Sequence, residues 1–158
     1  MPGRRAPALV VGTLLAAAVL AGCGADVPGQ ARIGLVPSGD RALIDGYVTD
    51  SNQAGDAGPT VQTQFLRDTQ AQGAPFPPDR CFGDVTLRTD LVARTLRPDP
   101  GWRPPETAPG SGAPGGAVYV VAAAVSVRKG QQEVREDVGS KHFVIRDGRV
   151  TGYAPCAD

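Results

Sequence analysis

The early part of the chain has apolar residues at helical spacing. Between residues 43 and 48, Leu, Ile, Tyr and Val recur at positions i, i+1, i+4 and i+5, which lie on one face of a helix. This helix is predicted to end near Asn52, because the sequence Gly-Asp-Ala-Gly-Pro at residues 55–59 breaks the chain. Helical spacing resumes at residue 61 and continues until Gly73. The pattern therefore predicts two short helices before any strand.

After the helices, the apolar spacing changes to a period of two. Residues 85–94 alternate between apolar and polar side chains, as in a strand with one face in water. Residues 117–128 are apolar on both parities, which predicts a central strand that is covered on both faces. Between these strands, residues 98–116 contain six Pro and five Gly. This composition predicts a long irregular loop, because Pro cannot donate hydrogen bonds to a sheet.

The last part of the chain predicts two more strands. The apolar parity changes within residues 133–146, so we expect a bulge at Gly139. Asp-Gly at residues 147–148 is a strong signal for a two-residue hairpin turn, and residues 150–154 form the closing strand. The predicted order is helix, helix, then an antiparallel meander.

These elements resemble the nuclear transport factor 2-like superfamily, which includes polyketide cyclases, dehydratases and ketosteroid isomerases. The resemblance rests on Asn-Gln-Ala-Gly-Asp at residues 52–56, the second helix, the long strands and the hairpin Phe-Val-Ile-Arg-Asp-Gly-Arg-Val at residues 143–150. It spans residues 39–155 and implies an α+β fold, with two N-terminal helices packed on a curved, cone-like antiparallel sheet. The insert at residues 98–116 and the lack of an evident third helix depart from the family.

The resemblance implies that the interior of the cone holds a small apolar molecule, or acid-base residues in the enzymes. Tyr47, Asp90 and His142 are the candidates here, although none stands in a motif that transfers residue by residue. Asp90 shares its strand face with arginines, so a solvated row of charges is the alternative. The alternative for His142 is a position on the solvent-facing or helix-facing side of its strand. The alternative for Tyr47 is a packing role in the core.

Composition and charge exclude several functions. Lys and Arg number 16 and Asp and Glu also number 16, so the chain lacks the positive charge with which proteins bind nucleic acids. One His and three Cys show no metal-ligand spacing, and we expect no metal and no cofactor.

The N-terminus has the pattern of an export signal. A short cationic start at residues 1–5 precedes an uncharged apolar stretch at residues 6–20, which is too short to span a bilayer comfortably. Leu20-Ala21-Gly22-Cys23 resembles the lipobox of bacterial lipoproteins. That resemblance implies cleavage before Cys23 and acylation of its thiol, which holds the protein on the outer face of the cell membrane. The alternative is an ordinary signal peptide in which Cys23 has no role.

The domain organisation follows from these patterns: residues 1–22 are a signal peptide, residues 23–37 a flexible tether and residues 38–158 the α+β domain. Outside the cytoplasm, Cys81 and Cys156 are predicted to form a disulfide, with two buried free thiols as the alternative. Trp102, in the loop rich in Gly and Pro, is a candidate recognition anchor, or else it folds back onto the end of the sheet.

The sequence predicts a lipid-anchored, extracytoplasmic, non-catalytic domain that binds a small apolar ligand or an envelope protein. One alternative is a cyclase, dehydratase or isomerase that uses Asp90 or His142, and another is a structural accessory domain of the envelope. The content of the sheet interior distinguishes them, because a polar pocket favours the enzyme, an apolar pocket the binder and a packed interior the accessory domain.

Overall fold

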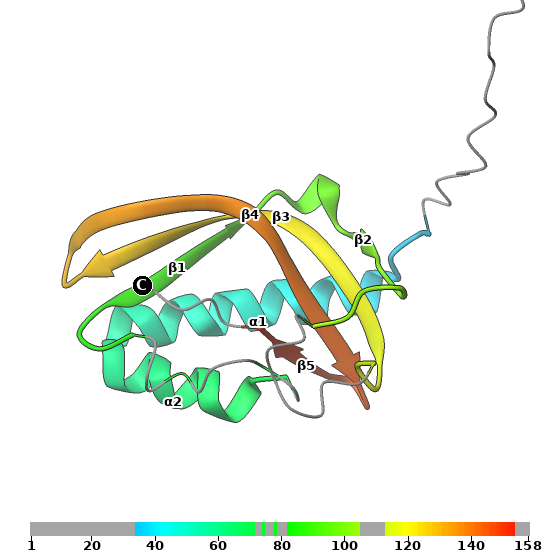
Figure 1. Ribbon diagram of the computed structural model, residues 1–158, viewed down its shortest axis with the longest axis horizontal. Coiled ribbons are helices and arrows are strands. Elements are labelled where there is room, and N and C mark those ends of the chain that lie inside the picture. The colour runs from blue at the N-terminus through cyan, green and yellow to red at the C-terminus, as the bar shows by residue number, and fades with distance from the viewer. Residues whose placement is uncertain (1–33, 72–73, 75–77, 79–81, 105–112, 154–158) are drawn as a thin grey trace, which may run out of the picture. The chain divides into compact units, whose positions relative to one another are not determined.

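The computed structural model describes residues 34–71, 74, 78, 82–104 and 113–153. The chain divides into residues 1–31 and 32–158, and all the described residues belong to the second unit. Within this unit, two helices lie against one face of a curled antiparallel sheet (Figure 1). The fold is therefore α+β, as the sequence predicts. Cys23, Cys81 and Cys156 lie outside the described residues, as does the predicted signal peptide.

The first helix, α1, runs from Ser38–Ala57 and is longer than predicted. Helix α2 follows at Pro59–Thr69, and Pro59 is at the first helical position, where its missing N–H costs nothing. The break falls on Gly58 alone, whose φ of 122° lies in a region that favours glycine. Gly55, which we expected to end the first helix, is helical and buried instead. One glycine therefore suffices for the corner between the two helices.

The sheet has the strand order β1-β3-β4-β5, and β2 pairs with β3 beside β1. All these pairings are antiparallel. The strands are β1 at Thr86–Leu91, β2 at Arg97–Pro98, β3 at Ala117–Lys129, β4 at Gln132–Arg146 and β5 at Arg149–Gly152, and a short 3-10 helix, η2, lies at Ala93–Thr95.

Odd-numbered residues of the two long strands face the helices, and we call this the inner face of the sheet. Phe143 and Val121 are fully buried there, in one cluster with Ile44 of α1. That cluster also contains Val48, Leu96, Tyr119 and Ile145. A second cluster joins Leu66 of α2 to the far end of the sheet and contains Phe82, Leu87 and Val127. The two clusters hold both helices on the inner face.

The predicted bulge at Gly139 is wrong. Gly139 pairs regularly with Ala123, and the register shifts nearer the hairpin, where Val134 is the extra residue in β4. The apolar parity changes for another reason. Val138 is 78% exposed on the outer face, so it does not belong to the core that fixes the parity of Phe143.

The hairpin after β4 is confirmed. Asp147 and Gly148 both have positive φ, at 51° and 72°, as a type I′ turn requires. The loop predicted at residues 98–116 begins one residue late, because Pro98 belongs to β2 and the Asp99 N–H donates to Val118 O at 2.8 Å. On the outer face of the central strand β3, Val118, Val120 and Ser126 are buried, whereas Ala122 and Ala124 between them are only partly buried.

Candidate functional site

Two side-chain amides cover the outer edge of β1. The Gln62 amide accepts from Leu87 N–H at 2.7 Å and donates to Leu87 O at 2.7 Å, and Asn52 makes the same pair of bonds with Thr89 at 2.8 and 2.9 Å. Each amide therefore bonds as a strand neighbour would. We call this the closed edge of the sheet.

Gln62 reaches the strand because α1 passes very close to it. A Cβ on Gly55 would lie 2.7 Å from Gln62 Nε2 and 3.0 Å from Leu87 O, so only glycine leaves room for the amide. Gln62 is 2% exposed and also donates to Ser51 O at 3.0 Å. At Gln62, the closed edge is therefore buried and its amide is hydrogen-bonded at both its oxygen and its nitrogen.

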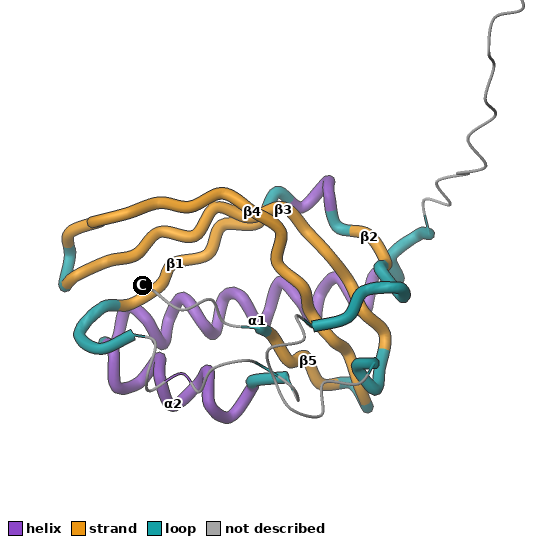
Figure 2. The backbone as a smooth tube through the Cα atoms, viewed as in Figure 1, coloured by secondary structure: helices purple, strands orange, loops and turns teal. Residues whose placement is uncertain are grey.

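At the opposite edge of the sheet, much of β4 has no second neighbouring strand among the described residues. Figure 2 shows β4 continuing beside β3 well beyond the end of β5, which pairs only with residues 143–146. All residues of β4 from 132 to 140 are exposed. Ala122 of β3 uses its N–H and C=O toward the β1 side, accepting from Val92 N and donating to Thr95 Oγ1. Because bonding alternates along a strand, the neighbours of Ala122 bond to β4.

The outward-facing groups of β4 follow from this alternation. Asp137, Gly139 and Lys141 pair with odd residues of β3 and bond to it. The N–H and C=O groups of Glu136, Val138 and Ser140 therefore point away from β3, and no described residue pairs with them. We call Glu136, Val138 and Ser140 the open edge.

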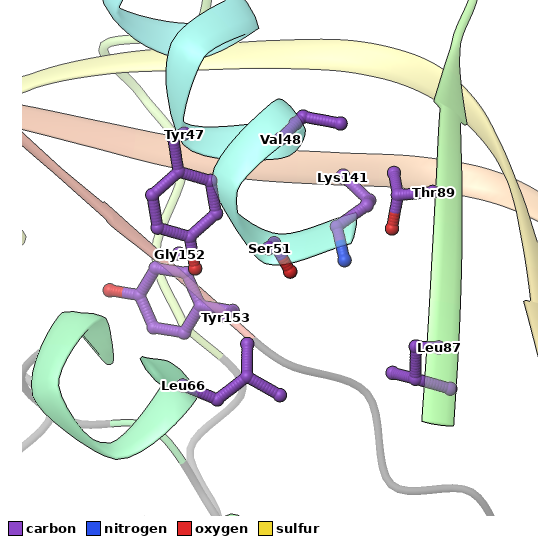
Figure 3. A pocket seen from close by; sticks show the side chains of 9 residues that line it. All are labelled: Tyr47, Val48, Ser51, Leu66, Leu87, Thr89, Lys141, Gly152 and Tyr153. Atoms are coloured by element: carbon purple, nitrogen blue, oxygen red, sulfur yellow. The ribbon is translucent and has the colours of Figure 1, made fainter. Parts of the chain in front are cut away.

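A small cleft lies between α1, α2 and the inner face of the sheet. Figure 3 shows Lys141 pointing into it, toward Ser51 of α1 and Thr89 of β1. Its volume is about 10 Å³, which is room for one water molecule. The cleft is lined by Tyr47, Val48, Ser51, Leu66, Leu87, Thr89, Lys141, Gly152 and Tyr153.

Lys141 is the one charged side chain that lines this cleft. Burial lowers the pKa of Lys141 to about 8, and no carboxylate among the described residues pairs with it. Burial also raises the pKa of Tyr47 and of Tyr153, so both phenols are neutral near pH 7. Lys141 was not among the residues predicted from the sequence, although it shares the parity of Phe143 and that signal places it on the inner face.

The outer face carries a cluster around Trp102. Its ring stacks on His142 with centroids 4.1 Å apart, and Tyr153 packs edge-on against it at 4.8 Å. Asp99 Oδ2 lies 3.2 Å from His142 Nε2. Burial lowers the pKa of His142, although the Asp99 carboxylate opposes this in part, so the imidazole is mainly neutral at pH 7. The start of the loop thus folds over the end of β4.

The predicted acid-base candidates do not meet. Asp90 and His142 both lie on the outer face, away from the cleft, and their partners on β3, Ala124 and Val120, are four residues apart. That separation is about 13 Å along the strand. Asp90 is exposed and lies 3.7 Å from Arg88. Tyr47 packs on Phe65 and Phe143 in the core, with ring centroids 5.3 and 5.6 Å away.

Other features of the described residues give no further site. They contain no group of three or more His, Cys, Asp or Glu side chains that could hold a metal ion. None of the helices among them has the length and apolar character needed to cross a membrane. A wide, open groove of about 740 Å³ runs along the solvent side of α2, where Val61 is half-exposed.

The chain matches no protein-family model, and neither the comparison with curated proteins nor that with solved structures finds a match.

Proposed function

We propose that this protein is a lipid-anchored, extracytoplasmic domain that binds an envelope protein by strand addition at the open edge. The observation that carries the proposal is the contrast between the two edges of one sheet. Gln62 and Asn52 satisfy the strand groups of the closed edge, whereas the outward groups of Glu136, Val138 and Ser140 have no partner among the described residues. An extended peptide segment satisfies such groups and gains affinity from main-chain hydrogen bonds.

The side chains of the open edge indicate the kind of segment that fits. Val138 is 78% exposed on the outer face, beside the partly buried Ala122 and Ala124 of β3. Glu136 lies on the same face, one pleat further along. A partner strand with an apolar residue beside Val138 and a basic residue beside Glu136 complements this surface.

The geometry supports a protein partner better than the other functions that the sequence suggested. The interior cleft, with room for one water, is too small for an apolar metabolite, and the groove of about 740 Å³ along α2 is wide and open to solvent, whereas such sites usually enclose most of the ligand. The enzyme alternative lacks a convergent acid-base pair, because Asp90 and His142 lie apart on the outer face. A relationship to the nuclear transport factor 2-like superfamily is part of the proposal, supported by two helices on the inner face of a curled antiparallel sheet. The disulfide between Cys81 and Cys156 is also part of the proposal.

The tether of the proposal is Cys23, at the end of Leu20-Ala21-Gly22-Cys23. Expressed in a bacterial host, the wild-type protein is expected to partition into detergent, because two or more acyl chains anchor a protein stably. Cys23→Ser removes the acceptor thiol and should accumulate as the unprocessed precursor. Phase partitioning and intact mass measure both effects. Mature proteins whose masses differ only by the exchange of sulfur for oxygen would exclude acylation at Cys23.

Docking at the open edge is tested by site-specific photo-crosslinking in the native envelope. A photoreactive amino acid in place of Val138 is expected to give one discrete product with another envelope protein. The same amino acid in place of Val61, an exposed valine on α2, is the matched control and should not give it. Products of equal yield from both positions would contradict docking at β4.

Ser140→Pro then tests whether the backbone makes the contact. Its N–H points outward, and the residue before it is Gly139, which tolerates the restriction that proline imposes. We expect Ser140→Pro to reduce the crosslink at residue 138 by about tenfold or more, since a lost interaction of 1.4 kcal/mol is a factor of ten. Ser140→Ala keeps the N–H and should leave the yield unchanged. An unchanged yield in Ser140→Pro, with an unchanged melting temperature, would refute strand addition.

A further inference from the structure

The cleft at Lys141 contains an unusual lysine. The chain has two lysines, and the other one, Lys129, is exposed with its Nζ 2.7 Å from Asp84 Oδ2. Lys141 is partly buried, and no carboxylate among the described residues pairs with it. A buried ammonium without a counter-charge costs several kcal/mol. An anion from solution would offset this cost while the amine stays protonated.

The hydroxyl groups around Lys141 favour the anion. Ser51 and Thr89 line the cleft from opposite sides, and Figure 3 shows Lys141 Nζ between them. Their backbone groups are already used, because Ser51 O accepts from Gln62 and the Thr89 N–H and C=O bond to Asn52. The side-chain hydroxyls of Ser51 and Thr89 face the cleft, and each can donate a hydrogen bond. Three donors thus converge where the described residues supply no negative charge.

The size of the cleft limits the ligand. With a volume of about 10 Å³ it accepts one particle of about the size of a water molecule. Phosphate, sulfate and carboxylates are too large, whereas a halide ion is close to the size of water. Asp137, which lies on the same face of β4 as Lys141, pairs instead with Arg135, whose Nε is 2.8 Å away.

We propose that this cleft is a binding site for a small monovalent anion such as chloride, held by Lys141 Nζ and by the hydroxyls of Ser51 and Thr89. The site is independent of strand addition at the open edge. A single water molecule beside a neutral amine is the competing occupant, and it gives no dependence on the type of anion.

The test is a titration of both lysines by NMR, on the full chain labelled with isotopic lysine in detergent micelles. One series contains chloride and the other gluconate, at the same ionic strength of about 0.2 M, so that screening is equal. A bound anion favours the protonated amine, so the pKa of Lys141 is expected to be higher in chloride by about 0.5 or more. Lys129 is the internal control and should titrate identically in both. An unchanged Lys141 in the two media would overturn the proposal and assign the cleft to water.

Thermal unfolding gives a second readout with variants. Chloride is expected to raise the melting temperature of the wild type relative to gluconate, because a ligand that binds only the folded state stabilises it. Lys141→Met, which keeps the apolar stem, should lose that difference, and Ser51→Ala combined with Thr89→Val should reduce it. Bromide should give the same difference between wild type and Lys141→Met as chloride, whereas sulfate, which stabilises both forms by exclusion from the protein surface, should give no difference between them. The same chloride effect in wild type and Lys141→Met would also overturn the proposal.

Discussion

Gln62→Met is expected to lower the free energy of unfolding by about 4 kcal/mol, since it leaves three buried backbone groups without partners at about 1–3 kcal/mol each. Those groups are Leu87 N–H, Leu87 C=O and Ser51 C=O, all of which bond to the Gln62 amide. Methionine retains the length and apolar stem of glutamine, so the loss measures the hydrogen bonds rather than a cavity. Urea unfolding followed by circular dichroism gives the value.

Asn52→Leu is the matched comparison for this prediction. Asn52 makes the same pair of bonds with Thr89 but is only partly buried, so water can replace the amide. We expect a loss of about 1–2 kcal/mol for this variant. Equal losses for the two variants would contradict the view that burial makes the Gln62 amide so costly to remove.

Lys141→Met is expected to lose stability relative to the wild type as the pH rises. In a gluconate medium, the free energy of unfolding of this variant relative to the wild type should fall by about 3 kcal/mol between pH 7 and pH 10.5. The slope is about 1.4 kcal/mol per pH unit between the pKa of Lys141 in the folded chain and its pKa in the unfolded chain. The cause is the burial that lowers the pKa of Lys141 from 10.5 to about 8.

The direction of this change follows from proton binding. Below pH 8, Lys141 is protonated in both the folded and the unfolded chain, and the folded state bears the full cost of burying the charge. Between about 8 and 10.5, the folded chain has released the proton and the unfolded chain still holds it, so the wild type gains stability with pH. Unfolding in urea at a series of pH values measures the difference. Lys129→Met, which removes an exposed lysine paired with Asp84, is the control and should show no such gain. A flat difference for Lys141→Met would show that its amine is well solvated.

Local patterns in the sequence were sufficient to predict most of the elements. The change from helical to alternating spacing, the Asp-Gly turn and the apolar run of β3 each depend on neighbouring residues, and the structure confirms them. The bulge was misplaced because we treated Val138 as a core residue. Its exposure depends on how far β4 extends beyond the helices, which is a tertiary property.

The candidate site was much harder to predict. Gln62 and Asn52 are ordinary polar residues on helices, and their role depends on Leu87 and Thr89, which lie 25 and 37 residues away along the chain. No spacing rule connects a helix amide to one residue of a distant strand edge. The open edge likewise depends on where β5 stops, and Trp102 could be placed beside His142 only once β2 had aligned the loop with β3.

The two unlike edges also set how many strands this sheet can recruit. A sheet that is open at both edges can add copies without limit and grow into a fibre, as exposed edge strands tend to do. Here the amides of Gln62 and Asn52 occupy the edge at β1, so an added strand cannot pair there, whereas the outward groups of Glu136, Val138 and Ser140 in β4 have no partner among the described residues. The domain is then monovalent for an added strand. Strand addition at β4, as proposed, would therefore end a chain of such contacts instead of extending it, with one partner segment per copy of the domain.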